Sequence, residues 1–208
     1  MPGNDINVVD NKEQEHFRFT VLAPVKADTD DELAGRNDTS IVLLGKFDGD
    51  DVDEAVRALF GGDSGAPIWE RIAEVNGKDK LDWDIFLAPH HCSWHFFSDK
   101  SHKDDPTPTD ASLDVIDRRR DGAWVVASSK PLEDDDDDPP SYAAAEIYMG
   151  AVGLDNFICT GETPSRKTPL PILFLMTANG PVRGETPTIK NRSSGVLVRA
   201  ASTPRTYG

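Results

Sequence analysis

The chain has 208 residues, with 22 Lys or Arg against 37 Asp or Glu, so its formal net charge is −15. This length is enough to bury a substantial core, and the acidic surplus argues against a broad nucleic-acid-binding surface. No apolar run reaches the roughly 18–20 residues of a membrane-spanning helix, and the first residues lack the features of a signal peptide. Two cysteines, Cys92 and Cys159, argue against a disulfide framework and favour a cytoplasmic location.

Apolar periodicity predicts strands and helices that alternate through the middle of the chain, flanked by strand-rich ends. Predicted strands or apolar strand-sized segments cover 17–23, 40–47, 52–60, 84–88, 123–127, 157–160, 171–177 and 194–199, and predicted helices cover 67–75, 112–119 and 142–152. This alternation is typical of a layered α/β domain. We expect a single domain over 1–208, with an acidic loop at 130–140 and a C-terminal strand and tail at 181–208.

The main candidate for a functional site follows the predicted buried strand over 84–88, where His90 and His91 come directly after a proline. A strand fixes the position of an imidazole, and small neighbours leave room for an ion and a substrate. Asp63 also follows an apolar strand, so its carboxylate could bind the same ion. The alternative interpretation is that the histidines merely cap a strand, while Asp63 is the N-cap of the helix that begins near Pro67.

His95 and Cys92 are possible auxiliary ligands of this site. His95 lies four residues after His91, so both could share one helical face, and Cys92 could add a thiolate. With Asp63, these residues would make a self-contained zinc site. The aromatic residues around His95 favour the other interpretation, a partly buried segment in which His95 has no ligand role.

The segment Gly62-Asp63-Ser64-Gly65-Ala66-Pro67 resembles the nucleophile segment of chymotrypsin-like serine proteases. In such a site Ser64 would attack the acyl carbon, and backbone N–H groups would form the oxyanion hole. The base and the acid of those proteases come earlier in the chain, yet the only histidine before Ser64 is His16. Gly-Asp-Ser-Gly is also a sound turn and helix start, which is the interpretation we favour.

Two charged runs are better interpreted as structural features. Arg118-Arg119-Arg120 closes the predicted helix over 112–119, where cations complement the helix dipole, and phosphate binding is the alternative. The five aspartates at 134–138 predict a solvated loop. Loose binding of a divalent cation is the alternative, although the run offers no fixed coordination geometry.

Seven segments follow one another in a specific order: Phe17-Arg-Phe-Thr-Val-Leu-Ala-Pro24, Arg36-Asn-Asp-Thr-Ser-Ile-Val-Leu-Leu44, Leu59-Phe-Gly-Gly-Asp63, Asp84-Ile-Phe-Leu-Ala-Pro-His-His91, Val125-Val-Ala-Ser-Ser129, Pro140-Ser-Tyr-Ala143 and Phe157-Ile-Cys-Thr-Gly161. This succession resembles the second half of a metallo-β-lactamase-fold hydrolase, and most closely the hydrolase domain of competence DNA-uptake proteins. The resemblance implies half or more of an αββα sandwich, with a mixed sheet and flanking helices.

The resemblance also implies a metal site. Asp63 would be the metal-bridging carboxylate and His91 the last metal histidine, with His90 beside it. The complete site would hold zinc or another divalent metal, two ions in all, and would hydrolyse a phosphoester or similar bond. The family's His-x-His-x-Asp-His motif has no counterpart here, Cys92 replaces a glycine, and a later His-Pro is absent at Asp138-Pro139.

Because most ligands are missing, the resemblance implies a hydrolase subunit or fragment, whose remaining ligands come from a partner or a missing N-terminal half. The alternative is a non-catalytic interaction protein that keeps the fold and has lost the site. Half a sandwich leaves an apolar sheet face exposed, so either hypothesis implies a protein partner or a homo-oligomer.

Overall fold

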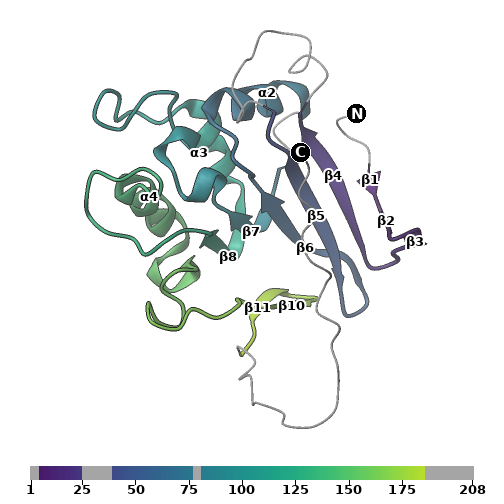
Figure 1. Cartoon of the computed structure of the whole chain (residues 1–208). Helices are drawn as coiled ribbons and strands as arrows, with labels where there is room; N and C mark the ends of the chain where they lie inside the picture. The colour runs from purple at the N-terminus through teal and green to yellow at the C-terminus, as the bar shows by residue number, and fades with distance from the viewer. Residues whose placement is uncertain (1–4, 25–38, 77–80, 186–208) are drawn as a thin grey trace, which may run out of the picture.

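The computed structural model describes residues 5–24, 39–76 and 81–185, and its centre is a mixed seven-stranded sheet (Figure 1). The strands lie side by side in the order β1 (Asp5–Ile6), β4 (Phe17–Ala23), β5 (Val42–Gly49), β6 (Val52–Phe60), β7 (Trp83–Leu87), β8 (Arg119–Ala127) and β9 (Phe157–Cys159). The pairs from β1 to β6 are antiparallel and the pairs from β6 to β9 are parallel. The α/β class expected from the sequence is therefore confirmed.

Each parallel pair is joined by a helix, as parallel strands require. These helices are α2 (Ala66–Asn76), α3 (Asp110–Asp117) and α4 (Tyr142–Val152). Thr109 and Ser141 are the N-caps of α3 and α4. Their hydroxyls accept hydrogen bonds from the backbone N–H groups of Ser112 and Ala144. Three short 3₁₀ turns complete the helical elements: η2 (Pro89–His91), η3 (Trp94–Phe96) and η4 (Leu154–Asn156).

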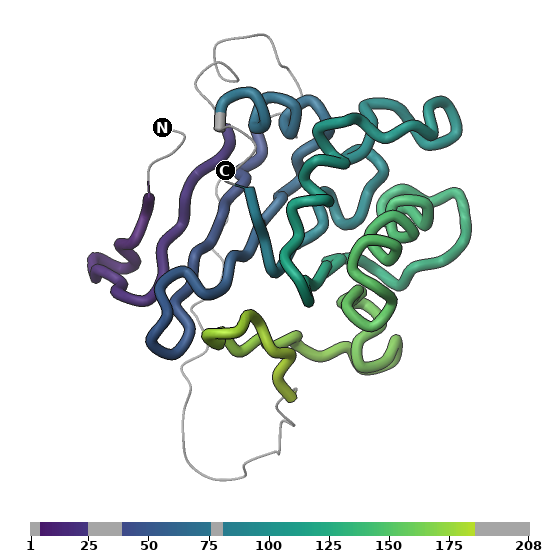
Figure 2. Tube along the Cα trace, turned by 180° about the vertical axis from the view of Figure 1, so that it is seen from behind, coloured from purple at the N-terminus to yellow at the C-terminus, as the bar shows by residue number. Residues whose placement is uncertain are grey.

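One face of the sheet packs against α2, α3 and α4 (Figure 2). A single apolar core lies between the helices and this face. Its largest members are aromatic: Trp69 of α2, Phe86 of β7, Phe96 of η3 and Tyr148 of α4 have ring centroids 5.3–6.1 Å apart. Trp83 is also fully buried there, and its indole N–H donates to the carbonyl of Val115. This core ties the helices to the parallel strands that carry the candidate site.

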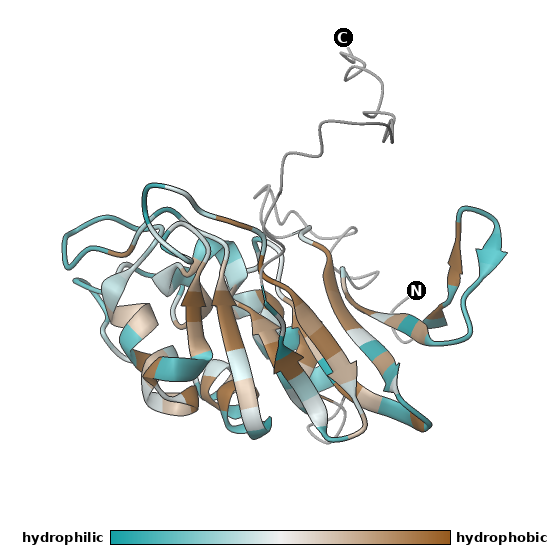
Figure 3. Cartoon of the chain, turned by 90° about the horizontal axis from the view of Figure 1, so that it is seen from below, coloured by the Kyte–Doolittle hydropathy of each residue, from teal (hydrophilic) through white to brown (hydrophobic). Residues whose placement is uncertain are grey.

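The opposite face has a smaller core and only a partial cover. The hairpin of β10 (Phe174–Thr177) and β11 (Gly180–Arg183) lies against the strands there, and its Phe174 and Met176 pack on Val56 and Ile85. A second hairpin, β2 (Val8–Val9) and β3 (Lys12–Glu13), projects as an arm beyond β1 (Figure 3). Within the described residues, the structure thus has one helical layer and one incompletely covered sheet face.

Most elements predicted from the sequence are present, with shifted ends in some cases. The helix over 142–152 and the strands over 17–23 and 52–60 have the predicted bounds, whereas the predicted helix over 112–119 ends at Asp117. Arg118 is the C-cap of that helix and the Arg119 guanidinium donates to the Ile116 carbonyl, as the predicted role at the helix end requires. Arg119 and Arg120 themselves already belong to β8. The predicted strand over 171–177 starts only at Phe174, and the predicted strand over 194–199 lies outside the described residues.

The acidic stretch over 130–140 is a loop, as predicted. None of the described helices is both long and apolar enough to span a bilayer.

Candidate functional site

The candidate site lies where the parallel strands β6, β7 and β8 end, so it is built from three loops at one edge of the sheet. The first two loops are joined by a hydrogen bond of 2.8 Å from the His90 N–H to the Gly62 carbonyl. They approach so closely that a Cβ at Gly61 would lie 2.4 Å from Cγ of Pro89. Glycine at position 61 is what permits this contact.

The structure brings Asp63 and His91 together, as the sequence predicted. Nε2 of His91 lies 3.5 Å from Oδ1 of Asp63, and the side chains are 53% and 44% exposed. The other ring nitrogen of His91, Nδ1, lies 2.8 Å from the carbonyl oxygen of Ser128 after β8. A carbonyl can only accept a hydrogen bond, so Nδ1 carries a proton and Nε2 faces the carboxylate.

This arrangement calls for a positive charge between the two side chains. In the neutral imidazole, Nε2 presents a lone pair to the lone pairs of the carboxylate, which repel it. Either a second proton on the ring or a bound cation removes this repulsion. A tetrahedral zinc ion with ordinary N and O bond lengths would hold its two ligand atoms roughly 3.3–3.5 Å apart, which agrees with the observed 3.5 Å. The spacing of the donor pair therefore agrees with a metal ion, and equally with an ion pair between Asp63 and a protonated His91.

The backbone of the β7 loop is strained. His90, His91 and Cys92 have φ angles of 47°, 56° and 69°, so three successive non-glycine residues are left-handed. Such conformations cost free energy and are concentrated at functional sites. Because of them, His91 and His95 lie on separate 3₁₀ turns rather than on one helix, and the prediction of a shared helical face is wrong.

His95 has its own acidic neighbour. Its Nδ1 lies 3.2 Å from Oγ of Ser93 and 3.7 Å from Oδ2 of Asp138. The carboxylate of Asp138 is held by the backbone N–H of Trp94, at 3.2 and 3.3 Å from its two oxygens. The ring of His90 contacts the rings of both His91 and His95, with centroids 6.4 and 5.9 Å away.

Cys92 and Ser64 point away from this cluster. Cys92 is fully buried in the core among the helices, and burial raises the pKa of its thiol, so the structure does not bring a thiolate to the site. Ser64 is also fully buried, and its hydroxyl donates to the Gly61 carbonyl at 2.6 Å. No described hydrogen bond joins Ser64 to a histidine, so nothing in its surroundings prepares it as a nucleophile.

Asp63 does not act as the helix cap that the alternative interpretation required, since α2 begins three residues later, at Ala66. Sequence reasoning missed Ser128 and Asp138, which lie 37 and 44 residues from their contacts His91 and Trp94. The only sequence signal for Asp138 was that Asp138-Pro139 stands where the resembled metallo-β-lactamase family has a His-Pro pair. Within the described ranges, no three His, Cys, Asp or Glu side chains are already arranged around one ion position.

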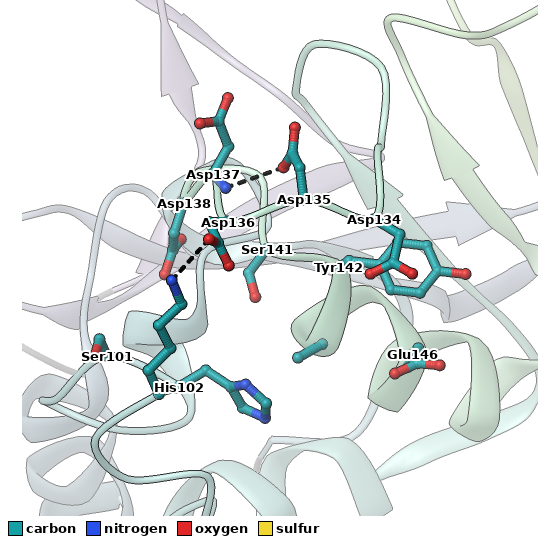
Figure 4. Close-up of a pocket in the computed structure, with 12 residues that line it drawn as sticks. Ser101, His102, Asp134, Asp135, Asp136, Asp137, Asp138, Ser141, Tyr142 and Glu146 are labelled. Carbon is teal, nitrogen blue, oxygen red and sulfur yellow. Dashed lines mark hydrogen bonds and ion pairs between the residues drawn. The ribbon is translucent and has the colours of Figure 1, made fainter.

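A cavity of about 350 Å³ lies beside the cluster, between the acidic loop and α4 (Figure 4). Asp134 to Asp138, Glu146, His102 and Lys103 line it, with Ser101, Ser141, Tyr142 and Ala143. Lys103 pairs with Asp136 at 2.8 Å. Asp138 belongs both to this cavity and to the His95 contact, so the acidic loop adjoins the candidate site.

Comparison with known proteins adds no relative: the chain matches no protein-family model, no curated protein and no solved structure.

Proposed function

We propose that the chain is a subunit or fragment of a metal-dependent hydrolase of the metallo-β-lactamase superfamily, acting on a phosphoester or similar bond. The observation that supports this best is the Asp63–His91 pair, whose ligand atoms are 3.5 Å apart at the C-terminal ends of parallel strands. The order of sequence segments that resembles this superfamily supports the same proposal. So does the strained backbone at His90 and His91.

Asp63 and His91 would hold the ion, and His90 would lie beside them. A bound divalent metal activates water as hydroxide and stabilises the negative charge that develops during hydrolysis. The Ser128 carbonyl keeps the proton of His91 on Nδ1, which leaves Nε2 free for the ion, as is usual for metal-bound histidines.

The described residues supply fewer ligands than a catalytic zinc site, which normally has three from protein. We propose that the rest come from a partner with the missing N-terminal half, or from a second copy, and that the site then holds two ions. The incompletely covered sheet face supports this, because an exposed apolar face favours association. The same face supports the alternative function, a non-catalytic interaction protein with the fold but without the site.

The test is metal binding by the purified full chain. We expect Zn²⁺ to broaden or shift the NMR signals of the His91 ring and of the Gly62 and Ser128 amides. Asp63→Asn and His91→Gln should each weaken zinc binding about tenfold or more, since each removes a ligand. His16→Gln is the matched control, because His16 is 84% exposed and its ion-pair partner among the described residues is Asp48.

Equal zinc affinity in the wild-type chain and in both site variants would overturn the metal-site proposal. A second outcome is zinc binding that depends on both residues, but no hydrolysis of a phosphodiester such as bis(p-nitrophenyl) phosphate when a partner with the missing N-terminal half is added. That outcome would favour the interaction protein.

A further inference from the structure

We propose that the N-terminal arm, residues 5–13, exchanges between two copies of this chain, so that β1 of each copy pairs with β4 of the other. The partner is therefore a second copy, and the interaction surface is the N-terminal arm together with the outer edge of β4. This inference goes beyond the proposed function, because it involves neither the Asp63–His91 pair nor a metal ion.

The first argument is that the tip of the N-terminal arm is a well-formed hairpin that stays exposed. β2 and β3 form a two-stranded sheet of their own. Both residues of the turn between them, Asp10 and Asn11, have positive φ angles, of 52° and 59°, as a type I′ turn requires. Every residue from Val8 to Glu13 is exposed. A two-stranded hairpin by itself is only marginally stable in water, so this one gains stability from a surface that covers it.

The second argument is the apolar surface that the N-terminal arm leaves open in its own chain. Ile6, Val8 and Val9 are 45%, 54% and 47% exposed, and the hairpin that carries the two valines projects away from the main sheet (Figure 3). In an exchanged dimer the N-terminal arm has to cross from one copy to the other. Val8 and Val9 then lie at the junction of the two copies, where their burial favours association.

The third argument is the slight attachment of the N-terminal arm to its own chain. Among the described residues, β1 pairs with β4 through Asp5 opposite Thr20 and Ile6 opposite Phe19. The Asp5 carboxylate accepts a hydrogen bond from the Thr20 hydroxyl and lies 3.7 Å from Nε of Arg18. Exposed ion pairs contribute little stability, and short terminal pairings open readily. The N-terminal arm can therefore leave its own β4 at little cost in free energy.

The fourth argument identifies the partner as a second copy. Arg18 is the one charged residue of β4, and Asp5 of the N-terminal arm supplies the opposite charge. The arm of a second copy reproduces this complementary pair and the same strand register, so exchange keeps every contact of β1 and adds the burial of the valines. The N-terminal arm and the β4 edge adjoin each other in one chain. A single two-fold axis therefore satisfies both arms and closes the dimer.

The experiment cross-links the exchanged strands. One full-length variant carries Ile6→Cys and a second carries Phe19→Cys, at positions that lie opposite each other in the register of β1 and β4. After the two are mixed, incubated and mildly oxidised, we expect a covalent heterodimer. Val8→Cys mixed with Phe19→Cys is the matched control and should cross-link far less, because Val8 is equally exposed but pairs with Glu13 within the N-terminal arm.

A second measurement is sedimentation velocity over a concentration series. A chain with both Ile6→Cys and Phe19→Cys, oxidised at low concentration, has its N-terminal arm locked to its own β4, so it should stay monomeric where the wild type dimerises. Reduction should restore the dimer. The pair Val8→Ser and Val9→Ser should weaken dimerisation about tenfold or more, because two aliphatic side chains are lost from the junction. Val75→Ser is the control, since Val75 is 58% exposed on α2.

Three outcomes would overturn arm exchange. The first is cross-linking of Ile6→Cys with Phe19→Cys that does not exceed that of the control pair. The second is a locked chain that dimerises like the wild type, which would assign the association to another surface, such as the incompletely covered sheet face. The third is a wild-type chain that stays monomeric throughout the concentration series. None of these results depends on zinc, so the proposed function is tested separately.

Discussion

Tyr148 places a hydroxyl group in the middle of the aromatic core. The residue is fully buried, its ring contacts Phe86, Phe96 and Phe97, and its hydroxyl has no hydrogen-bond partner among the described residues. Burial raises the pKa of this phenol well above its ordinary value. A buried donor without a partner costs free energy, so the Tyr148 hydroxyl lowers the free energy of unfolding.

We therefore expect Tyr148→Phe to raise the free energy of unfolding by about 1 kcal/mol, because it removes the unpaired hydroxyl and keeps the ring. Urea denaturation followed by tryptophan fluorescence measures the change. Tyr142→Phe, at the start of the same helix, is the control and should have little effect. Loss of stability in Tyr148→Phe would show that the hydroxyl has a partner after all.

At this scale, part of the site could be predicted from the sequence. Asp63 and His91 each follow an apolar strand, and neighbouring parallel strands end at the same edge of a sheet, so their meeting was predictable. The support from Ser128 and Asp138 was not, because it depends on how distant loops come together. The role of Cys92 was mistaken, since the left-handed turn that directs its side chain into the core has no signal in the residue types.

At the scale of elements, the antiparallel strands β4, β5 and β6 are cross-linked by charge. Glu54 of β6 pairs with Arg18 of β4, lies 3.8 Å from Nζ of Lys46 on β5, and receives a hydrogen bond of 3.2 Å from Arg57. Burial opposes ionisation of Glu54, but the Arg18 hydrogen bond and the neighbouring positive charges outweigh it and lower the pKa of the carboxyl. The folded state thus favours the charged form.

This shift makes stability depend on pH. A lowered folded-state pKa stabilises the fold above the ordinary value of 4.5, and that stabilisation is lost as the pH falls through the folded-state value. We expect Glu54→Gln to lower the free energy of unfolding by about 1 kcal/mol at pH 7, with the difference closing as the pH falls below 4.5.

Denaturation curves of wild type and Glu54→Gln, recorded from about pH 3 to about pH 7 so that they span the carboxyl titration, test this expectation. Asp53→Asn serves as control, since Asp53 is the exposed neighbour on the same strand. A difference that stays constant with pH would show that Glu54 contributes through packing and not through charge.

The long elements were predictable and the short ones were not. α4 and β4 have strong apolar patterns bounded by a serine cap and a proline, which define their ends locally. β1 is only two residues long and exists because Asp5 pairs with Thr20 and Ile6 with Phe19. Pairing across such a distance is a tertiary effect, so no local pattern indicates it.

At the scale of the whole molecule, the sheet face opposite the helices is apolar and partly open. Phe17 and Phe19 of β4, Phe47 of β5 and Phe60 of β6 form one ring cluster there, with centroids 5.6–6.1 Å apart, and all four remain partly exposed. The β10–β11 hairpin also exposes apolar side chains on its outer side, where Leu175 and Val182 pair across the strands. We propose that a protein partner or a second copy covers this face.

We expect the isolated chain to bind a hydrophobic dye and to self-associate as its concentration rises, and the double substitution Phe17→Ser and Phe19→Ser to reduce dye fluorescence by about half or more. Sedimentation velocity over a concentration series measures the association. Leu154→Ser is the control, because Leu154 is 76% exposed and lies on η4. A monomer that binds no dye would contradict the open face.

The left-handed run from His90 to Cys92 also has a consequence for how this loop would change over generations. Glycine adopts such angles without steric cost. Substitution of these residues by glycine would therefore relieve the backbone strain wherever their side chains are dispensable. If the proposed metal site has no role, positions 90 and 91 should therefore drift toward glycine in related chains. If the proposed site is used, both histidines should persist despite the strain.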